Sequence, residues 1–576
     1  MKKVWKGAAA AIAALSLGVT GFVGASSAYA VDGDTGTTQN ATTGSIKITP
    51  KKGHTYKVYQ VLTGSVLGDA IGNPEAGDAF KTENGQGAEG ANMTAKEAAE
   101  YFGTLSSKTD TSNAADTARE IAKFVNFEAT TAGEVSWTEG ATAQTITGLT
   151  PGYYFIRDTM DPTTGVNDTE SVDVAVVVAA GDTETITPKD SSVTVEKKVK
   201  DQTLNDDWDT SDWQDSADYS IGDWIPFQLT GTLPSKYEDY TSYYYKFIDT
   251  PSTGLDLTWD TAPKVSADST EVDTAHALKV YLDANKNGTF DDGDTDITSA
   301  ADVKAADHTV TFDDLKTLKV NDQAVTFTNS DHIVVEYWGK LNNNAIVTAN
   351  NPATDEHDTN AKDHNGNPNT VKVEYSRNPN GDGHGTTPED KVTVFSFELI
   401  WNKKDDANKF LSGAEFTLYR AVDVNDGQPQ WGDDEGVVIK PTEGHVFTHK
   451  GLGDGIYKLV ESKTPTGYNT MADLVFQISA THETDSADPQ LTQLTSTYYL
   501  DWGDKKAGEK FGTVETITLD QATKPTGHIL FDIENKKGSE LPSTGGMGTV
   551  VLYTVGGLIV LIAGVGLAIA LRRRQA

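Results

Sequence analysis

Five oxygen-bearing side chains recur at fixed intervals within one twelve-residue stretch, 283–294. They occupy positions 1, 3, 5, 9 and 12, around Gly288 at position 6, and they are Asp283, Asn285, Asn287, Asp291 and Asp294. This is the spacing of a calcium-binding loop, in which the glycine allows a sharp turn. Asp294 replaces the usual glutamate and no helical pattern flanks the loop, so we expect Ca²⁺ binding in the weak extracellular range. A polar hairpin without metal is the alternative.

A second pattern places an acid at the end of an alternating strand in two parts of the chain. Residues 451–461 repeat the spacing of residues 148–158, a glycine-rich turn followed by an alternating strand that ends in Glu461 or Asp158. Alternation of apolar and polar residues is typical of strands with one buried face. For Asp158 we expect an ordinary exposed carboxylate.

The surroundings of Glu461 are more specific. Residues 457–468 resemble the E-box of Gram-positive pilins and of collagen-adhesin B-type domains, departing from its usual form at Ser462 and Thr464. Residues 403–416 look like the opening strand of the same module, and residues 531–535 look like its last strand. The resemblance covers residues 391–537. It implies an intramolecular isopeptide bond between Lys403 and Asn535, with Glu461 as the catalytic acid.

The chemistry of such a bond explains these residue types. A lysine amine attacks an asparagine carboxamide only when it is neutral, and burial among apolar side chains favours the neutral form. Lys403 continues the alternating apolar face of Phe397, Leu399 and Trp401. A nearby carboxylic acid is needed to polarise the carboxamide and to relay protons to the leaving ammonia.

The region before residue 391 shows a looser version of the same arrangement. Residues 193–199, 245–250 and 374–379 resemble the pilin middle domain, in which a lysine, an aspartate and an asparagine form the cross-link. The resemblance implies Lys197, Asp249 and Asn378 in these roles, and Glu336 could replace Asp249 as the acid. Further upstream no asparagine closes the strand expected at 172–180, so we predict no cross-link there.

Both ends of the chain carry targeting signals. Basic Lys2, Lys3 and Lys6, an apolar run and Ala28-Tyr29-Ala30 predict a signal peptide at 1–30. Near the other end, a pentapeptide precedes the uncharged stretch 550–571, which is long enough to span a bilayer, and a basic tail follows. The pentapeptide is Leu541, Pro542, Ser543, Thr544 and Gly545. This order resembles sortase substrates of Gram-positive bacteria, which are cut between the threonine and the glycine.

Lys189 lies in the sequence Thr187-Pro188-Lys189-Asp190, which resembles the pilin motif whose lysine attacks the sortase-bound threonine of another subunit. The resemblance implies an intermolecular bond between Lys189 and Thr544. Thr187 stands where that motif usually has tyrosine, and an ordinary solvated lysine is the alternative.

The spacing of strand and turn signals predicts a mainly β protein of tandem immunoglobulin-like sandwiches. A capping box at Thr94 and Glu97 and a second helical pattern at 114–127 make the first domain mixed α+β. We place the first domain at 31–190, a middle isopeptide-forming domain at 191–388, and a collagen-adhesin B-type domain at 389–538. The anchoring signal follows at 541–576.

Composition narrows the function further. The net charge of −37 argues against nucleic acid as a partner. The absence of cysteine excludes disulfides and thiolate metal sites, and the 11 histidines form no hydrolase pattern. We expect the major subunit of a wall-anchored fimbria that supports surface adhesion, with pilin-specific and housekeeping sortases, identical subunits, minor or tip pilins and peptidoglycan as partners. A monomeric adhesin for a host ligand is the alternative.

Overall fold

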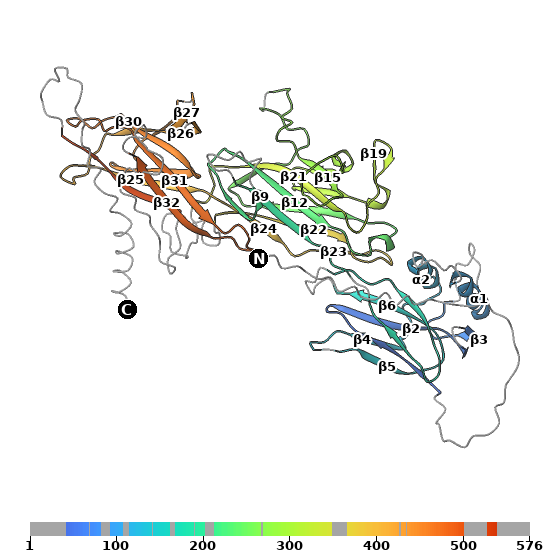
Figure 1. Cartoon of the computed structure of the whole chain (residues 1–576). Helices are drawn as coiled ribbons and strands as arrows, with labels where there is room; N and C mark the ends of the chain where they lie inside the picture. Colours follow the sequence, from blue (N-terminus) through green and yellow to red (C-terminus); the bar gives the residue numbers. More distant parts are fainter. Residues whose placement is uncertain are drawn as a thin grey trace, which may run out of the picture.

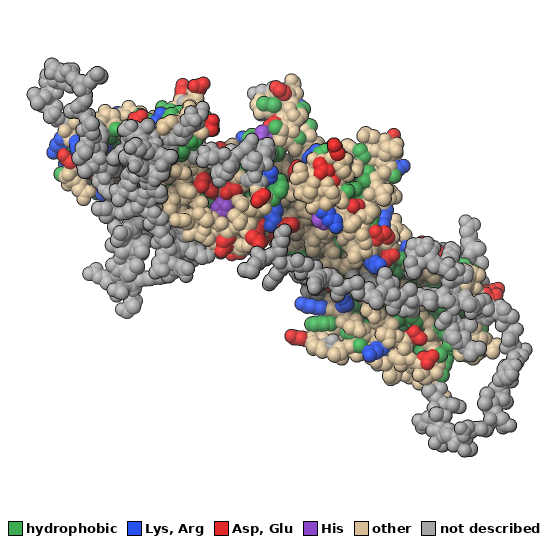
Figure 2. Space-filling model, in the orientation of Figure 1, with side chains coloured by type: hydrophobic (Ala, Val, Ile, Leu, Met, Phe, Trp, Pro, Cys, Tyr) green, Lys and Arg blue, Asp and Glu red, His purple; other side chains and the backbone are tan. Residues whose placement is uncertain are grey.

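The computed structural model describes residues 42–67, 70–81, 93–106, 114–140, 142–161, 168–188, 191–201, 212–266, 269–347, 366–425, 428–433, 435–499 and 527–537. The described residues form three units that follow one another along an elongated molecule (Figure 1). Carboxylate side chains are distributed over the face shown in Figure 2, as the net charge of −37 requires. Within the described residues no helix is long and apolar enough to cross a membrane.

The first unit is a two-layer sandwich with helices on one side. One sheet has the order β5-β1-β8, and the other has the order β3-β2-β6-β7 with β4 beside β2. The strands are β1 (Gly44–Ile48), β2 (His54–Leu67), β3 (Ala70–Ala76), β4 (Gly133–Ser136), β5 (Gln144–Leu149), β6 (Gly152–Met160), β7 (Val174–Val178) and β8 (Thr183–Ile186). Helices α1 (Ala95–Ser106) and α2 (Ala114–Ala122) contribute to a separate core with the second sheet. The mixed α+β prediction is confirmed.

The N-terminus of α1 shows why the sequence specified it. The backbone N–H of Thr94 donates to Glu97 Oε2 at 2.8 Å, and the N–H of Glu97 donates to Thr94 Oγ1 at 3.3 Å. These reciprocal bonds form the predicted capping box. Helix α2 ends at Ala122, earlier than the predicted Phe127, because Phe124 and Val125 turn into the core.

The middle unit consists of two facing sheets around one large core. The first sheet has the order β10-β9-β12-β21-β15-β16, with β14 beside β21. Its strands are β9 (Val195–Lys200), β10 (Trp213–Gln214), β12 (Trp224–Thr232), β14 (Leu255–Thr258), β15 (Lys279–Asp283), β16 (Thr295–Asp296) and β21 (His332–Leu341).

The second sheet of this unit has the order β11-β24-β22-β13-β18-β17, with β23 beside β22. Its strands are β11 (Ser216–Asp218), β13 (Tyr245–Pro251), β17 (Asp302–Lys304), β18 (Thr309–Phe312), β22 (Asn367–Ser376), β23 (His384–Thr386) and β24 (Asp390–Phe395). Smaller elements are η4 (Tyr237–Asp239), η5 (Thr298–Ala300), η6 (Leu315–Thr317) and the hairpin of β19 (Lys319–Val320) and β20 (Gln323–Ala324).

The third unit is a sandwich of a three-stranded sheet, β29-β25-β33, and a larger sheet, β27-β26-β30-β31-β32 with β28 beside β26. Its strands are β25 (Phe397–Asp405), β26 (Glu415–Asn425), β27 (Gln428–Trp431), β28 (Val437–Ile439), β29 (Val446–Leu452), β30 (Gly455–Lys463), β31 (Leu474–His482), β32 (Leu491–Tyr499) and β33 (His528–Asn535). The tandem-sandwich prediction is confirmed.

The last strand of the middle unit corrects our domain boundary. We placed the change of domain at 388/389, yet β24 pairs with β22 and β11. Val392 and Val394 accordingly belong to the core of the middle unit, whereas Phe397 belongs to that of the third. The turn-rich stretch before β24 connects two neighbouring strands of one sheet, and the chain changes unit only after Phe395.

Candidate cross-linking sites

Three strands of the third unit bring Lys403, Glu461 and Asn535 together in its core. Residues alternate between buried and half-buried along β25 and β33, and both Lys403 and Asn535 fall on the buried phase. Glu461 comes from β30 in the facing sheet. The three residues are 0%, 5% and 1% exposed in sequence order, so their polar groups need hydrogen-bond partners inside the protein.

The contacts within this cluster place the amine on one side of the carboxamide and the acid on the other. Lys403 Nζ donates to Asn535 Oδ1 at 2.7 Å, and Asn535 Nδ2 donates to Glu461 Oε1 at 2.8 Å and to Oε2 at 3.0 Å. Lys403 Nζ lies 3.9 Å from Glu461 Oε1. The acid therefore contacts the nitrogen that would leave, rather than the carbonyl oxygen that we expected it to polarise.

The surroundings of Lys403 favour its neutral form. Burial lowers the pKa of its amine to about 8, although the negative charges of Glu461 and Glu534 oppose this shift. Trp401, two residues earlier on the same face, stacks with Phe447 and Phe531 at centroid distances of 5.2 and 5.6 Å. The rings belong to the same apolar core as the fully buried Lys403 side chain, and desolvation disfavours the charged form of the amine.

Further hydrogen bonds hold Glu461 in position. Its Oε2 accepts from the backbone N–H of Met471 at 3.0 Å and from Thr464 Oγ1 at 3.1 Å. Thr464 is one of the positions where the sequence departs from the usual E-box, and its hydroxyl orients the acid directly.

The middle unit contains a second buried cluster. Lys197 Nζ donates to Asp249 Oδ1 at 2.8 Å and to Tyr337 Oη at 2.5 Å, and Tyr337 Oη donates to Asp249 Oδ2. Asn369 Nδ2 in turn donates to Tyr337 Oη at 3.1 Å. Burial lowers the pKa of the Lys197 amine, against the opposing charge of Asp249.

Asn369, and not Asn378, supplies the carboxamide of this cluster, which corrects our assignment. Asn378 lies two residues beyond the end of β22, in a turn where its Nδ2 donates to the carbonyl oxygen of Asp382. Asn369 lies inside β22 on its buried phase and is fully buried. Its Oδ1 has no hydrogen-bond partner among the described residues.

The sequence contained a signal for Asn369 that we did not use. Asn369 shares the inward phase of Val371, Val373 and Tyr375, so alternation alone placed it in the core. Asn367 has the same phase, but both of its amide atoms are hydrogen-bonded to backbone groups of Ile346, which leaves it a structural role.

Glu336 does not reach the cluster. It neighbours Tyr337 on β21 and therefore faces the opposite side of the sheet. There its Oε1 accepts from Tyr281 Oη and from Gln228 Nε2, both at 3.0 Å. Asp249 is the acid that contacts Lys197.

The first unit has a different buried polar pair. Asp158 is 3% exposed, contrary to our expectation. Both faces of β6 are covered, one by the helices and the other by the facing sheet of the sandwich. It pairs with His54 Nδ1 at 3.0 Å and accepts from the N–H of Ser171 at 2.8 Å. The shared sequence pattern is reproduced locally, since Gly148 and Gly451 both adopt positive φ angles, of 79° and 87°.

In the 283–294 loop the predicted ligand oxygens accept hydrogen bonds from the loop itself. Asp283 accepts from the N–H groups of Lys286 and Gly288, and Asp294 accepts from that of Ala284. The side-chain amides of Asn285 and Asn287 both donate to Asp291 Oδ2. To bind calcium, Asn285 and Asn287 would have to rotate so that their side-chain oxygens, rather than their NH2 groups, face the centre of the loop. Ca²⁺ binding by this loop stays a prediction.

Several of the predicted functional features fall outside the described residues, among them the membrane span 550–571 and the basic tail after it. The others are Lys189, the sortase motif Leu541–Gly545 with its acyl donor Thr544, and the signal peptide. Their roles stay predictions.

Comparison with known proteins adds independent findings. A family model described as a prealbumin-like fold domain matches residues 397–490, and one for the LPXTG cell wall anchor motif matches residues 533–576. The trypsin-resistant surface T6 protein of Streptococcus pyogenes is 24% identical over 290 residues, which cover 42% of this chain. The matched region spans 48% of that relative, about half its length.

Similar solved structures include the T6 backbone pilin of Streptococcus pyogenes, with a TM-score of 0.46 and 17% identity, over 86% of this chain and 99% of that one. The major pilin SpaD of Corynebacterium diphtheriae has a TM-score of 0.43 and 16% identity, over 86% and 98% of the two chains.

The anchor motif and the streptococcal relative define the class: the chain is a cell-wall-anchored surface protein of a Gram-positive bacterium. Within that class, residues 397–490 match the prealbumin-like fold domain, and part of the chain is similar to the streptococcal T6 surface protein.

Proposed function

We propose that this chain is the backbone subunit of a covalently polymerised pilus, closed internally by isopeptide bonds between Lys403 and Asn535 and between Lys197 and Asn369. The observation that carries the proposal is the recurrence of a buried lysine, acid and asparagine in two successive units of a wall-anchored protein. Burying a charged lysine amine costs free energy unless the amine is paired and hydrogen-bonded. Conversion of the amine to a neutral amide would remove that cost.

The bond-forming step needs no component from outside the cluster. A proton moves from the Lys403 ammonium to the Glu461 carboxylate, which turns a buried ion pair into a neutral amine and a neutral acid. The amine then attacks Cγ of Asn535, Glu461 gives its proton to Nδ2, and the carboxylate so regenerated takes the second proton that Nζ loses as the amide forms. The bond from Cγ to Nδ2 breaks, ammonia leaves, and Lys403 Nζ keeps the new amide bond.

The contact between Glu461 and Nδ2 supports this order of events, since the acid already touches the leaving group. In the middle unit, Asp249 can take the proton from Lys197 directly across 2.8 Å. Tyr337 bridges that acid to Asn369 Nδ2 and completes a proton path to the leaving nitrogen.

The proposed bonds would make the protein resistant to pulling, because of the strands that they join. β25 and β33 are parallel neighbours, the first and last described strands of the third unit. In the middle unit β9 and β22 belong to facing sheets. A tensile force would therefore act on covalent bonds rather than on strand hydrogen bonds alone.

Assembly follows from the two predicted intermolecular residues. Sortase would cleave after Thr544 and hold its carbonyl as an acyl-enzyme, and the Lys189 amine of another subunit would attack that carbonyl and release the enzyme. Linking one C-terminus to the first interdomain junction of the next molecule makes a non-closing head-to-tail contact, which produces a filament. A final transfer to peptidoglycan would anchor the polymer.

An immunoblot of cell-wall extracts tests polymerisation. The wild-type chain should give a high-mass ladder, and Lys189→Ala should give monomer. Lys198→Ala is the matched control, because this nearby lysine is engaged with Asp215 at 2.6 Å and should leave the ladder intact. A single band for the wild type would indicate a monomeric adhesin instead, and a ladder in Lys189→Ala would place the linkage on another lysine.

A further inference from the structure

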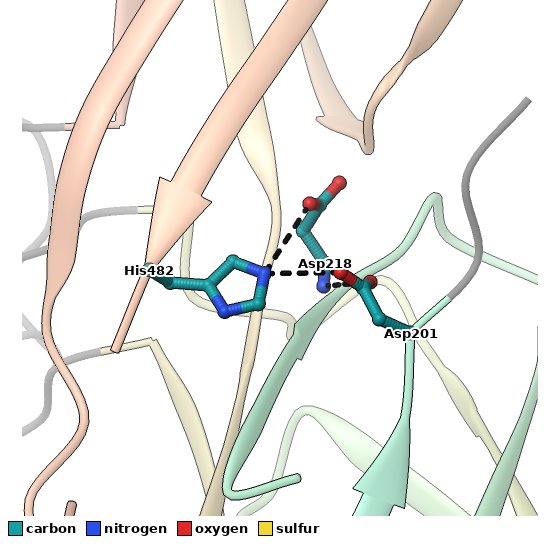
Figure 3. A group of neighbouring side chains, drawn as sticks. All are labelled: Asp201, Asp218 and His482. Carbon is teal, nitrogen blue, oxygen red and sulfur yellow. Dashed lines mark hydrogen bonds and ion pairs between the residues drawn. The ribbon is translucent and has the colours of Figure 1, made fainter. Parts of the chain in front are cut away.

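The junction between the middle and third units contains a buried polar cluster that the cross-linking chemistry does not use. β11 lies at this junction, where the N–H of Asp215 donates to the carbonyl oxygen of Thr484 and the N–H of Tyr219 donates to that of Phe395. Next to these backbone contacts three ionisable side chains converge (Figure 3).

The three side chains form what we call the junction triad: Asp201, Asp218 and His482. Asp201 directly follows β9 and Asp218 ends β11, both in the middle unit, whereas His482 ends β31 in the third unit. His482 Nε2 lies 3.2 Å from Asp201 Oδ2 and 3.8 Å from Asp218 Oδ2. One oxygen of each acid and the ring nitrogen lie within 4.8 Å of one another.

The hydrogen bonds on the far side of the imidazole fix its tautomer. Ser216 Oγ donates to the carbonyl oxygen of Glu483 at 2.7 Å, so its proton is already committed. It lies 2.6 Å from His482 Nδ1 and can only accept there. Nδ1 therefore carries the proton, and in the neutral ring Nε2 presents a lone pair to the two carboxylates.

Asp218 is the second indication that a cation belongs at this point. The residue is 3% exposed, and its Oδ1 accepts from the N–H of Asp454. Its Oδ2 faces His482 Nε2 at 3.8 Å, which is beyond hydrogen-bond distance. Asp201 and Asp454 lie beside this largely buried carboxylate, and like charges in such a place repel each other unless a cation lies between them.

We propose that the junction triad binds a divalent transition metal of the zinc type and thereby ties the middle unit to the third. Zinc bonds to imidazole nitrogen and carboxylate oxygen at about 2.0 to 2.2 Å, which separates tetrahedral ligands by about 3.3 Å. The distances of 3.2 and 3.8 Å from Nε2 lie near that value. A water molecule would complete the coordination.

The donor set and its support fit such a metal better than calcium. An imidazole nitrogen suits zinc, whereas calcium prefers oxygen ligands alone. Histidine ligands commonly donate their other ring N–H to a supporting acceptor, and Ser216 Oγ occupies that place. If the chain polymerises through Lys189 and Thr544 as proposed, the metal would lie on the path of tension between the two bonds.

Isothermal titration calorimetry of the whole three-domain chain, residues 31–538, tests the site with Zn²⁺ as the probe. The chain is freed of tags and metals, and millimolar Ca²⁺ is present to fill the 283–294 loop. We expect one tight Zn²⁺ site in the wild type, and a loss of affinity of at least about tenfold in Asp218→Asn and in His482→Gln. His384→Gln is the matched control, because this more exposed histidine also pairs with an acid, Glu374, at 3.1 Å.

A second measurement protects the test against misfolding of the variants. In the wild type, Zn²⁺ should slow amide hydrogen exchange in β11 and at the end of β31, and the His384→Gln variant should behave in the same way. Absence of Zn²⁺ binding by the wild type would overturn the proposal and leave a protonated His482 as the partner of the two acids. Undiminished binding in Asp218→Asn or His482→Gln would overturn it as well. Neither result depends on whether the chain polymerises.

Discussion

Replacing Glu461 with glutamine is the sharpest test of the proposed isopeptide chemistry. Glutamine keeps the size of the side chain and its hydrogen-bonding capacity, but it cannot take the proton from Lys403 and return it to Asn535 Nδ2. We expect Glu461→Gln to fold with the amide unformed. The buried lysine would then hold its contact with Asn535 Oδ1 only by hydrogen bonding.

The expected loss of stability follows from the size of the loop that the bond closes. Lys403 and Asn535 are 132 residues apart. By analogy with disulfides, a covalent link across such a loop restricts the unfolded chain by about 5 kcal/mol. For a domain of this size, about 3 to 4 °C per kcal/mol gives a decrease of about 15 to 20 °C in its melting temperature. Strain in the linked state would reduce this value.

Intact mass spectrometry and calorimetry together decide the outcome. The wild-type mass should fall short of the sequence mass by two ammonia molecules, and that of Glu461→Gln by one after allowing for the substitution. Glu415→Gln is the control, because this partly exposed acid of the same unit pairs with Lys463 at its surface and should change neither quantity appreciably. Two ammonia losses in Glu461→Gln would refute the role of this acid. A wild-type mass equal to the mass calculated from the sequence, with no ammonia lost, would refute both cross-links.

Other substitutions and conditions test the remaining sites. After allowing for the substitution, Asn369→Ala should show one ammonia loss in the intact mass, whereas Asn378→Ala should show two, as the wild type does; the reverse pattern would restore our first assignment. Millimolar Ca²⁺ should raise the melting temperature of the middle unit relative to chelator, and Asp291→Asn should weaken this effect; equal temperatures would make the loop a simple hairpin. Burial raises the pKa of Glu170 from 4.5 to about 7, so the folded chain holds this proton more tightly than the unfolded chain. The free energy of unfolding should therefore fall as pH rises from 4.5 to about 7. Thermal melts of Glu170→Gln should show a smaller fall over this range. The same pH dependence in the variant and the wild type would count against a role for Glu170.

The sequence alone determined the cluster of the third unit. Alternation along a strand specifies which residues share a face, so the position of Lys403 after three apolar residues of one phase already placed its amine in a core. The E-box and the closing strand supplied the acid and the carboxamide. The anchoring motif could likewise be read from order and composition, because it is a property of one continuous segment, whereas the secretion signal stays a prediction.

Only the tertiary structure decided which polar residues meet across separate strands. Alternation along β22 places Asn369 in a core, but only the packing of the facing sheet brings its carboxamide to Tyr337, which in turn contacts Lys197. The junction triad joins residues 201, 218 and 482, which no local pattern connects. The physical reason is that strand periodicity fixes the direction of a side chain, whereas its neighbours depend on how sheets stack and how domains contact each other.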